Sequence, residues 1–236
     1  MPDPGSLTWF RKPMPTATDP NAGGTLNVAF QLLDRAVVAG ASDTTVLDDE
    51  TGEVSHAGLL ELVAAFAGVL RGFGVVPGDR VVVELAGGRE AVVALLATAR
   101  IGAAGVTVPV GLPEPERVHI VSSTRPRVVV TADDEVMTDV LSRCDHQPGA
   151  VVATGATAPE SHAVPWDVVI RAGRSDPAAA VELRPGSPSV LLWPADPTDP
   201  ASDVRLRTTL EQAQRAVELA GAVPVTTADV LGSLFG

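Results

Sequence analysis

Short apolar runs alternate with longer amphipathic segments between residues 57 and 153, and turn residues separate them. The apolar runs predict strands, and the 3.6-residue spacing of apolar positions predicts the segments between them as helices. The predicted strands are 80–85, 104–108, 127–131 and 150–153, and the predicted helices are 57–72, 88–101, 113–123 and 134–143. Strands that alternate with helices form parallel sheets. The sequence therefore predicts an α/β fold with a mostly parallel sheet and helices on both faces.

The flanking regions extend this pattern less regularly. Upstream, the spacing predicts a helix after Gly24 that stops at Gly40, followed by a hairpin over 44–56. Downstream, we expect a short strand at 168–170, a strand at 190–193, a loop at 194–203 and a helix at 208–220. We interpret residues 1–24 as an irregular N-terminal arm and residues 25–236 as one α/β domain. That domain contains a Pro- and Gly-rich connection over 155–187.

Composition excludes several partner classes. The formal net charge is −12, whereas nucleic acids and anionic membranes are bound by positively charged surfaces. No apolar run approaches the roughly 18 residues of a membrane span. Cys144 is the single cysteine, so it has no partner for a disulfide within the chain. We expect a cytoplasmic protein that binds neither nucleic acid nor membrane.

Several segments resemble one enzyme family. They are LTWFRKP (7–13), GGTLNVAFQLLDRAVVAG (23–40), the stretch from GFGVVPGDRV to VTVPVG (72–111), LPEPERVHI (112–120) and RPRVVVTADD (125–134). Together they are similar to the N-terminal part of AMP-forming acyl-CoA synthetases, most of all to the acetyl- and propionyl-CoA synthetase branch. The resemblance implies the N-terminal subdomain of an adenylate-forming fold. In intact members, ATP and a carboxylate form an acyl-adenylate, and CoA then accepts the acyl group.

The resemblance also implies a phosphate-binding loop after the strand at 190–193. Family members carry T-S-G-T-T-G-x-P-K-G there, in which glycines let the backbone approach the phosphates and lysine adds positive charge. An ungapped reading of 194–203 sets Asp196, Asp199 and Asp203 on the three glycines and Ser202 on the lysine. Thr198 keeps a hydroxyl, so Thr198 and Ser202 are the only candidate cofactor-binding residues, as remnants of the phosphate loop.

Other positions depart from the family pattern as well. Met137 in TADDEVMTD (131–139) and His119 stand where the resemblance implies arginines, the former near the CoA nucleotide. We expect His119 to be an exposed helix residue. The Gly87–Glu90 turn either binds an anion at a helix N-terminus or, as we favour, only makes the turn. DVLGSLFG, where the chain stops, resembles the family's next strand, so the acyl pocket, adenine contacts and C-terminal lysine domain of the family are expected to be absent.

The remaining ionisable residues suggest no further chemistry. The histidines, with Cys144, have no metal-ligand spacing; they are His56, His119, His146 and His162. Neighbouring opposite charges at Asp34–Arg35 and Asp79–Arg80 are interpreted as local ion pairs or caps. We therefore predict no catalytic residue, no metal and no bound cofactor.

The sequence thus favours a non-catalytic homologue, a pseudoenzyme, that acts through protein contact. Its expected partners are a second copy of the chain, in a homo-oligomer, or an intact acyl-CoA synthetase. Three alternatives stay open: a protein that binds acyl-CoA or nucleotide without turnover, one part of a split acyl-CoA ligase, and a decayed gene product without a selected role.

Overall fold

The computed structural model describes residues 26–155, 157, 161–183, 188–192, 205–208, 219 and 225–235. Its main element is a seven-stranded sheet in the order β7-β6-β5-β3-β4-β8-β9. Neighbouring strands pair in parallel except β8 and β9, which are antiparallel. The strands are β3 (Arg80–Glu84), β4 (Ala104–Thr107), β5 (Val128–Thr131), β6 (Ala150–Ala153), β7 (Val164–Pro165), β8 (Pro188–Leu192) and β9 (Arg205–Thr208).

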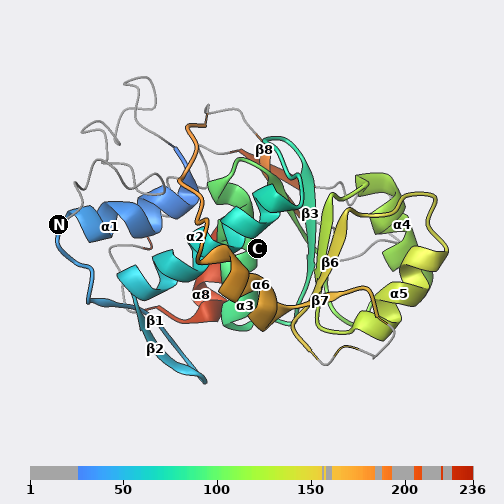
Figure 1. The fold of residues 1–236 in the computed structure, drawn as a ribbon, viewed down its shortest axis with the longest axis horizontal. Helices are drawn as coiled ribbons and strands as arrows, with labels where there is room; N and C mark the ends of the chain where they lie inside the picture. The colour runs from blue at the N-terminus through green and yellow to red at the C-terminus, as the bar shows by residue number, and fades with distance from the viewer. Residues whose placement is uncertain are drawn as a thin grey trace.

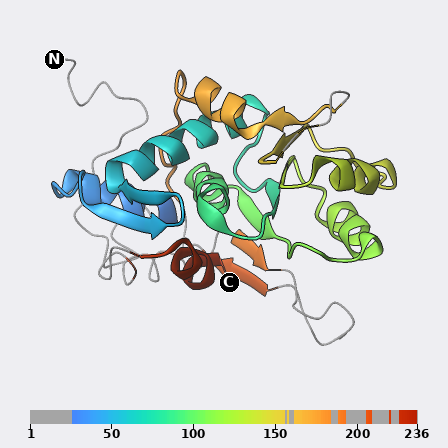
Figure 2. The ribbon, with the colours of Figure 1, turned by 90° about the horizontal axis from the view of Figure 1, so that it is seen from below.

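Helices cover both faces of the sheet, as the sequence predicts (Figures 1 and 2). One face carries α2 (His56–Gly72), α3 (Gly88–Arg100) and α6 (Trp166–Gly173), and the other carries α4 (Glu114–Thr124) and α5 (Asp134–Ser142). Each face of the sheet has its own hydrophobic core, and alternate valines of β3 pack into one or the other. Val81 and Val83 pack toward α2 and α3, whereas Val82 packs toward α4 and α5. This two-sided burial explains why the central strands are continuous apolar runs.

Local signals set several helix ends. The Ser55 hydroxyl accepts a hydrogen bond from the Gly58 N–H at 3.2 Å and so caps α2. Asp133 caps α5 in the same way, by accepting from the Val136 N–H at 3.0 Å. Pro113 precedes α4 as its N-cap residue, and Pro115 lies in the first turn, where a backbone N–H has no partner within the helix.

A smaller unit packs beside the α2 and α3 side of the sheet. The hairpin of β1 (Thr45–Asp49) and β2 (Gly52–Ser55) lies where the sequence predicts it. Before it, residues 28–38 form one helix whose middle is the π-helical turn η2 (Phe30–Asp34) and whose end is α1 (Arg35–Val38). The C-terminal α8 (Thr227–Val230) and η3 (Leu231–Phe235) lie next to α3, and Val225 bridges to Leu47 of β1.

Four sequence expectations need correction or stay untested. Val168–Ile170 is part of helix α6 and not a strand, because the apolar run forms one face of a helix packed on α2. Residues 229–235 of DVLGSLFG are helical in α8 and η3, not a strand, and β9 was not predicted. The helix expected at 208–220 and the arm at 1–24 lie outside the described residues, apart from Thr208 in β9 and Leu219. Within the part of the chain that the structure describes, no helix is long and apolar enough to cross a membrane.

Candidate functional site

The strand order identifies the carboxyl edge of the sheet as the place to search. From β3 the chain crosses through α3 to β4 on one side, and then through α4 to β5 on the other side of β3. The connection after β3 thus leads to β4 on one side, whereas the connection after β5 leads through α5 to β6 on the other, which makes a topological switch point between β3 and β5. Open α/β sheets bind their ligands in the crevice outside the carboxyl ends of the strands at such a point.

An ion pair occupies this switch point. Glu84 ends β3 with a side chain 5% exposed, and Arg117 reaches it from α4 with a side chain 15% exposed. The Arg117 Nε and Glu84 Oε1 atoms lie 2.8 Å apart, although their angle is not that of a hydrogen bond. The contact is therefore mainly electrostatic. Thr131, at the end of β5, lies opposite Glu84 in the strand pairing, and its hydroxyl donates to the Asp133 carbonyl at 3.2 Å.

The surroundings of Glu84 oppose its ionisation. Burial raises the pKa of Glu84 above its ordinary value, and the nearby Asp133 carboxylate adds to the rise. The Arg117 charge and the Thr131 hydroxyl act in the opposite direction without cancelling the effect. The Glu84 carboxyl group at the switch point therefore holds its proton more tightly than an exposed glutamate does.

The N-terminus of α5 adds further carboxylates to the same edge. Asp133 caps the helix, Asp134 is buried in its first turn, and Glu135 follows. A helix N-terminus favours negative charge, and here the chain's own carboxylates supply it. The expected CoA-side position, Met137, is buried in the apolar cluster between α5 and the sheet, and His119 is exposed on α4.

A cavity of about 310 Å³ lies at the same edge, on the α3 face. Its walls come from β3, α3, β4 and η3 and are mainly apolar, with Val83, Leu85, Ala91, Leu95, Val108 and Leu231 among them. Gly87 also lines it and has φ of +135°, a conformation that glycine adopts without strain. The cavity is large enough for a small apolar group and offers few polar partners.

The predicted phosphate-loop remnants, Thr198 and Ser202, lie outside the described residues, but the strands that flank them are placed. β8 is parallel to β4, with Leu192 opposite Thr107. The same Leu192 pairs with Arg205 at the start of β9. The connection 193–204 therefore leaves and re-enters the sheet at its carboxyl edge, two strands away from Glu84.

The Gly87–Glu90 turn supports the simpler of its two interpretations. Gly87 and Gly88 both have positive φ, so the glycines make the turn into α3. Arg89 does not face a ligand site: its Nε and Nη2 donate to the Asp49 carboxylate of β1 at 3.2 and 2.8 Å. The turn is therefore used to hold the β1–β2 hairpin.

The structure also corrects one expected ion pair. Asp34 does not pair with Arg35; it accepts two hydrogen bonds from Arg100, 66 residues away. Asp79, in contrast, accepts from the Val76 N–H and so caps the turn before β3, as expected. Glu84 and Arg117 are not among the site residues predicted from the sequence, although a glutamate that ends a Val-Val-Val run is a visible signal.

Comparison with known proteins agrees with this geometry. The AMP-binding enzyme family matches residues 33–201. Acetyl-coenzyme A synthetase from Streptomyces coelicolor is 35% identical over 139 residues, which cover 54% of this chain and 21% of that protein. The same enzyme from Streptomyces avermitilis is 37% identical over 139 residues, with the same coverage. The chain thus spans about a fifth of the length of these relatives.

Solved structures share the fold. The anthranilate CoA ligase AuaEII in complex with anthranoyl-AMP aligns with a TM-score of 0.69 and 17% identity, over 80% of this chain and 34% of that one. Apo MatB from Rhodopseudomonas palustris aligns with a TM-score of 0.65 and 16% identity, over 84% and 37%. The sheet order, the helices on both faces and the match over 33–201 lead to one conclusion: the chain belongs to the AMP-binding enzyme family and is similar to the N-terminal region of its acyl-CoA synthetases.

Proposed function

We propose that this chain is a non-catalytic member of the AMP-binding enzyme family and acts through contact with another protein. The observation that supports the absence of catalysis is the concentration of acidic residues at the carboxyl edge of the sheet. Glu84 lies there, already paired with Arg117, and Asp133 and Asp134 lie beside it at the N-terminus of α5. The sequence adds Asp196, Asp199 and Asp203 in the connection between β8 and β9.

This arrangement opposes triphosphate binding. Two unit charges of like sign 4 Å apart repel by about 1 kcal/mol in bulk water and by more near protein. Phosphoryl transfer needs the reverse, because cationic groups must neutralise the charge that spreads over the phosphate oxygens. Within the connection, prolines at 194, 197 and 200 also remove backbone N–H donors.

Pyrophosphate exchange and calorimetry test this half of the proposal. With ATP, magnesium and acetate or propionate, we expect no exchange above a protein-free blank and no heat of ATP binding. A variant with Asp196→Gly, Asp199→Gly, Asp203→Gly and Ser202→Lys should bind ATP measurably, because it removes three negative charges and adds one positive charge. Exchange by the unaltered chain would overturn the proposal.

Strand pairing supports the second half. Among the described residues, β9 pairs with β8 alone, so its other edge has no strand partner there. An edge strand presents backbone N–H and C=O groups to another chain. The partners we propose are a second copy of this chain or an intact acyl-CoA synthetase.

Light scattering and a binding assay distinguish these partners. A mass above 24.2 kDa at high protein concentration supports self-association. Capture of a purified acetyl-CoA synthetase by the immobilised chain supports the second partner. A monomer at every concentration that captures no synthetase would contradict the protein-contact role.

The apolar cavity favours a second candidate function, the binding of an acyl-CoA without turnover. Its volume of about 310 Å³ lies at the lower end of ligand pockets. Leu95→Phe should fill it, so a thermal shift with acetyl-CoA or propionyl-CoA should disappear in that variant. Absence of any shift in the unaltered chain removes this candidate.

A further inference from the structure

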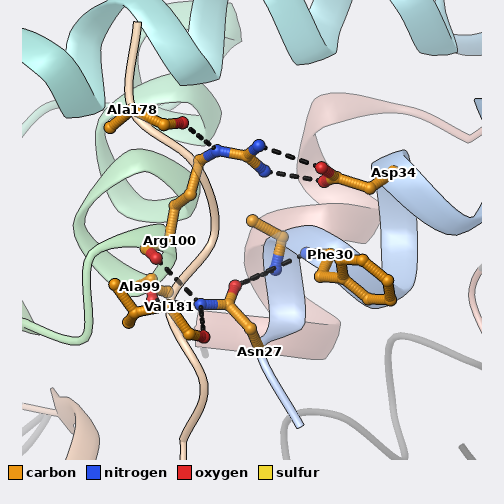
Figure 3. Close-up of polar contacts among 8 residues, drawn as sticks. Asn27, Phe30, Asp34, Ala99, Arg100, Ala178 and Val181 are labelled. Atoms are coloured by element: carbon orange, nitrogen blue, oxygen red, sulfur yellow. Dashed lines mark hydrogen bonds and ion pairs between the residues drawn. The ribbon is translucent and has the colours of Figure 1, made fainter. Parts of the chain in front are cut away.

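A fully buried polar cluster joins three segments that are distant in the sequence (Figure 3). Its side chains are Asn27, Asp34 and Arg100, each 0% exposed. They connect the helix at 28–38, the C-terminal end of α3 and the extended segment 177–183, which we call the strap. No residue of the cluster belongs to the carboxyl edge described above.

Asn27 caps two helices at once. Its Oδ1 accepts hydrogen bonds from the N–H groups of Ala29 and Phe30, at 3.1 and 3.4 Å, at the start of the first helix. Its Nδ2 donates to the carbonyls of Ala99 and Arg100, at 3.1 and 2.9 Å, at the end of α3. Both helix ends otherwise have backbone groups without an intrahelical partner.

Arg100 connects the same two helices through its charge. The guanidinium donates to both Asp34 oxygens, with Nη1–Oδ2 and Nη2–Oδ1 distances of 2.6 and 2.9 Å. A bidentate pair of this kind fixes orientation as well as distance. Because neither side chain is exposed, moving the first helix away would leave an unpaired charge inside the protein.

The strap is held by the same side chains. The Arg100 Nε donates to the Ala178 carbonyl at 2.7 Å, and the Asn27 Nδ2 donates to the Val181 carbonyl at 3.2 Å. The Val181 N–H donates to the Arg100 carbonyl at 2.9 Å. The strap has no regular secondary structure, so it depends on such partners for its buried backbone groups.

We infer that Asn27, Asp34 and Arg100 form a lock that makes the position of β8 depend on the N-terminal helix. The strap precedes β8 by only four residues, and β8 carries the connection 193–204 at its carboxyl end. Closing the lock fixes the strap and so holds β8 in register beside β4. Opening it releases the N-terminal helix, the strap and β8 together, while β3, β5 and β6 keep their pairing.

Amide hydrogen exchange of the unaltered chain tests the lock without any substitution. At low denaturant concentrations, segments 28–38, 177–183 and 188–192 should open as one unit, with equal opening free energies and equal denaturant dependence. Strands β3 and β5 should open only in a less frequent, larger event. Independent opening of the strap and the N-terminal helix would overturn the inference.

A pair of variants provides the second arm. Asn27→Ala should raise exchange in the strap and in β8 by about tenfold or more, because buried backbone groups lose their partner, and leave β3 and β5 protected. Thr98→Val is the matched control: Thr98 is also fully buried in α3, but its hydroxyl donates to Ala94, away from the strap. An equal rise throughout the sheet, or the same pattern in the control, contradicts the lock. If Asn27→Ala does not fold, the exchange of the unaltered chain decides.

Discussion

Gly68 lies where α2 passes closest to the chain that follows α6. A Cβ added at Gly68 would lie 2.0 Å from the Asp176 carbonyl oxygen, whereas one at Gly72, in the same helix, would meet nothing within 4 Å. We expect Gly68→Ala to lower the free energy of unfolding by about 3 kcal/mol or more, because backbone must move. Gly72→Ala should leave it unchanged or raise it by up to about 1 kcal/mol. Urea unfolding of both variants measures the difference, and equal effects would show that the close approach is wrong.

Glu84 gives a second prediction at this scale. Burial raises its pKa above the ordinary 4.5, so the folded chain holds the proton more tightly than the unfolded chain does. The contribution of Glu84 to stability is therefore fully present below pH 4.5 and is lost as pH rises through the folded pKa. Glu84→Gln should remove this loss, so stability should fall less between pH 4.5 and neutrality than in the unaltered chain.

Urea unfolding at several pH values measures that slope. Glu61→Gln is the control, because Glu61 is an exposed partner of Arg174 with a side chain 58% exposed. The control should keep the slope of the unaltered chain. Parallel pH curves for the unaltered chain and Glu84→Gln would show that Glu84 does not titrate as described.

Single residues also mark where sequence reasoning ends. That Glu84 ends a buried strand can be read from its place after three valines. The pairing of Asp34 with Arg100 cannot be read from the sequence, because the two residues are 66 positions apart and Arg35 is an adjacent alternative partner for Asp34. Local charge patterns predict ion pairs between residues that are close in the sequence, whereas the partners of a buried ion pair are determined by which helices pack together.

At the scale of elements, the β1–β2 hairpin depends on one cation from α3. Burial acts to raise the pKa of Asp49, but hydrogen bonds from Thr51 and Arg89 outweigh it and hold the pKa below the ordinary 3.8. Stability from this carboxylate is therefore present above pH 3.8 and is lost as pH falls through the folded pKa. Asp49→Asn should cost about 1 kcal/mol at neutral pH and remove that acid sensitivity.

Thermal unfolding between pH 3 and neutrality checks this result. Arg171→Ala serves as the comparison, because it breaks an exposed pair with Asp167 inside α6, with side chains 74% and 69% exposed. That change should alter stability by less than about 0.5 kcal/mol. A larger effect for Arg171→Ala than for Asp49→Asn would refute the role of the Arg89 contact.

The regular elements of the sheet could be predicted, and the exceptions have physical causes. The central strands and α2 to α5 follow from continuous valine runs and 3.6-residue spacing. The apolar run at 168–170 is too short for its periodicity to distinguish a strand from a buried helix. The close packing of Gly173 against the Ala65 backbone favours the helix α6. β9 is defined by its pairing with β8 across a twelve-residue connection, which leaves no local signal.

For the molecule as a whole, net charge sets the response to salt. A formal charge of −12 produces self-repulsion in the compact state, and salt screens it over about 10 Å at 0.1 M. The buried pair of Asp34 and Arg100 is screened little. We expect the melting temperature to rise with sodium chloride between low ionic strength and about 0.5 M. Potassium chloride should act equally, and a falling melting temperature would mean that surface ion pairs outweigh the repulsion.

The double cap at Asn27 sets an order of events during synthesis. Its acceptor at Val181 is 154 residues further along the chain. At the ~5–20 residues per second of translation, the first helix is made roughly 8 to 30 s before the strap emerges. Through that interval its buried face has no finished binding surface. The helix at 28–38 therefore reaches its final contacts only after the strap has been synthesised, and its apolar face is open to chaperones while the ribosome is still at work.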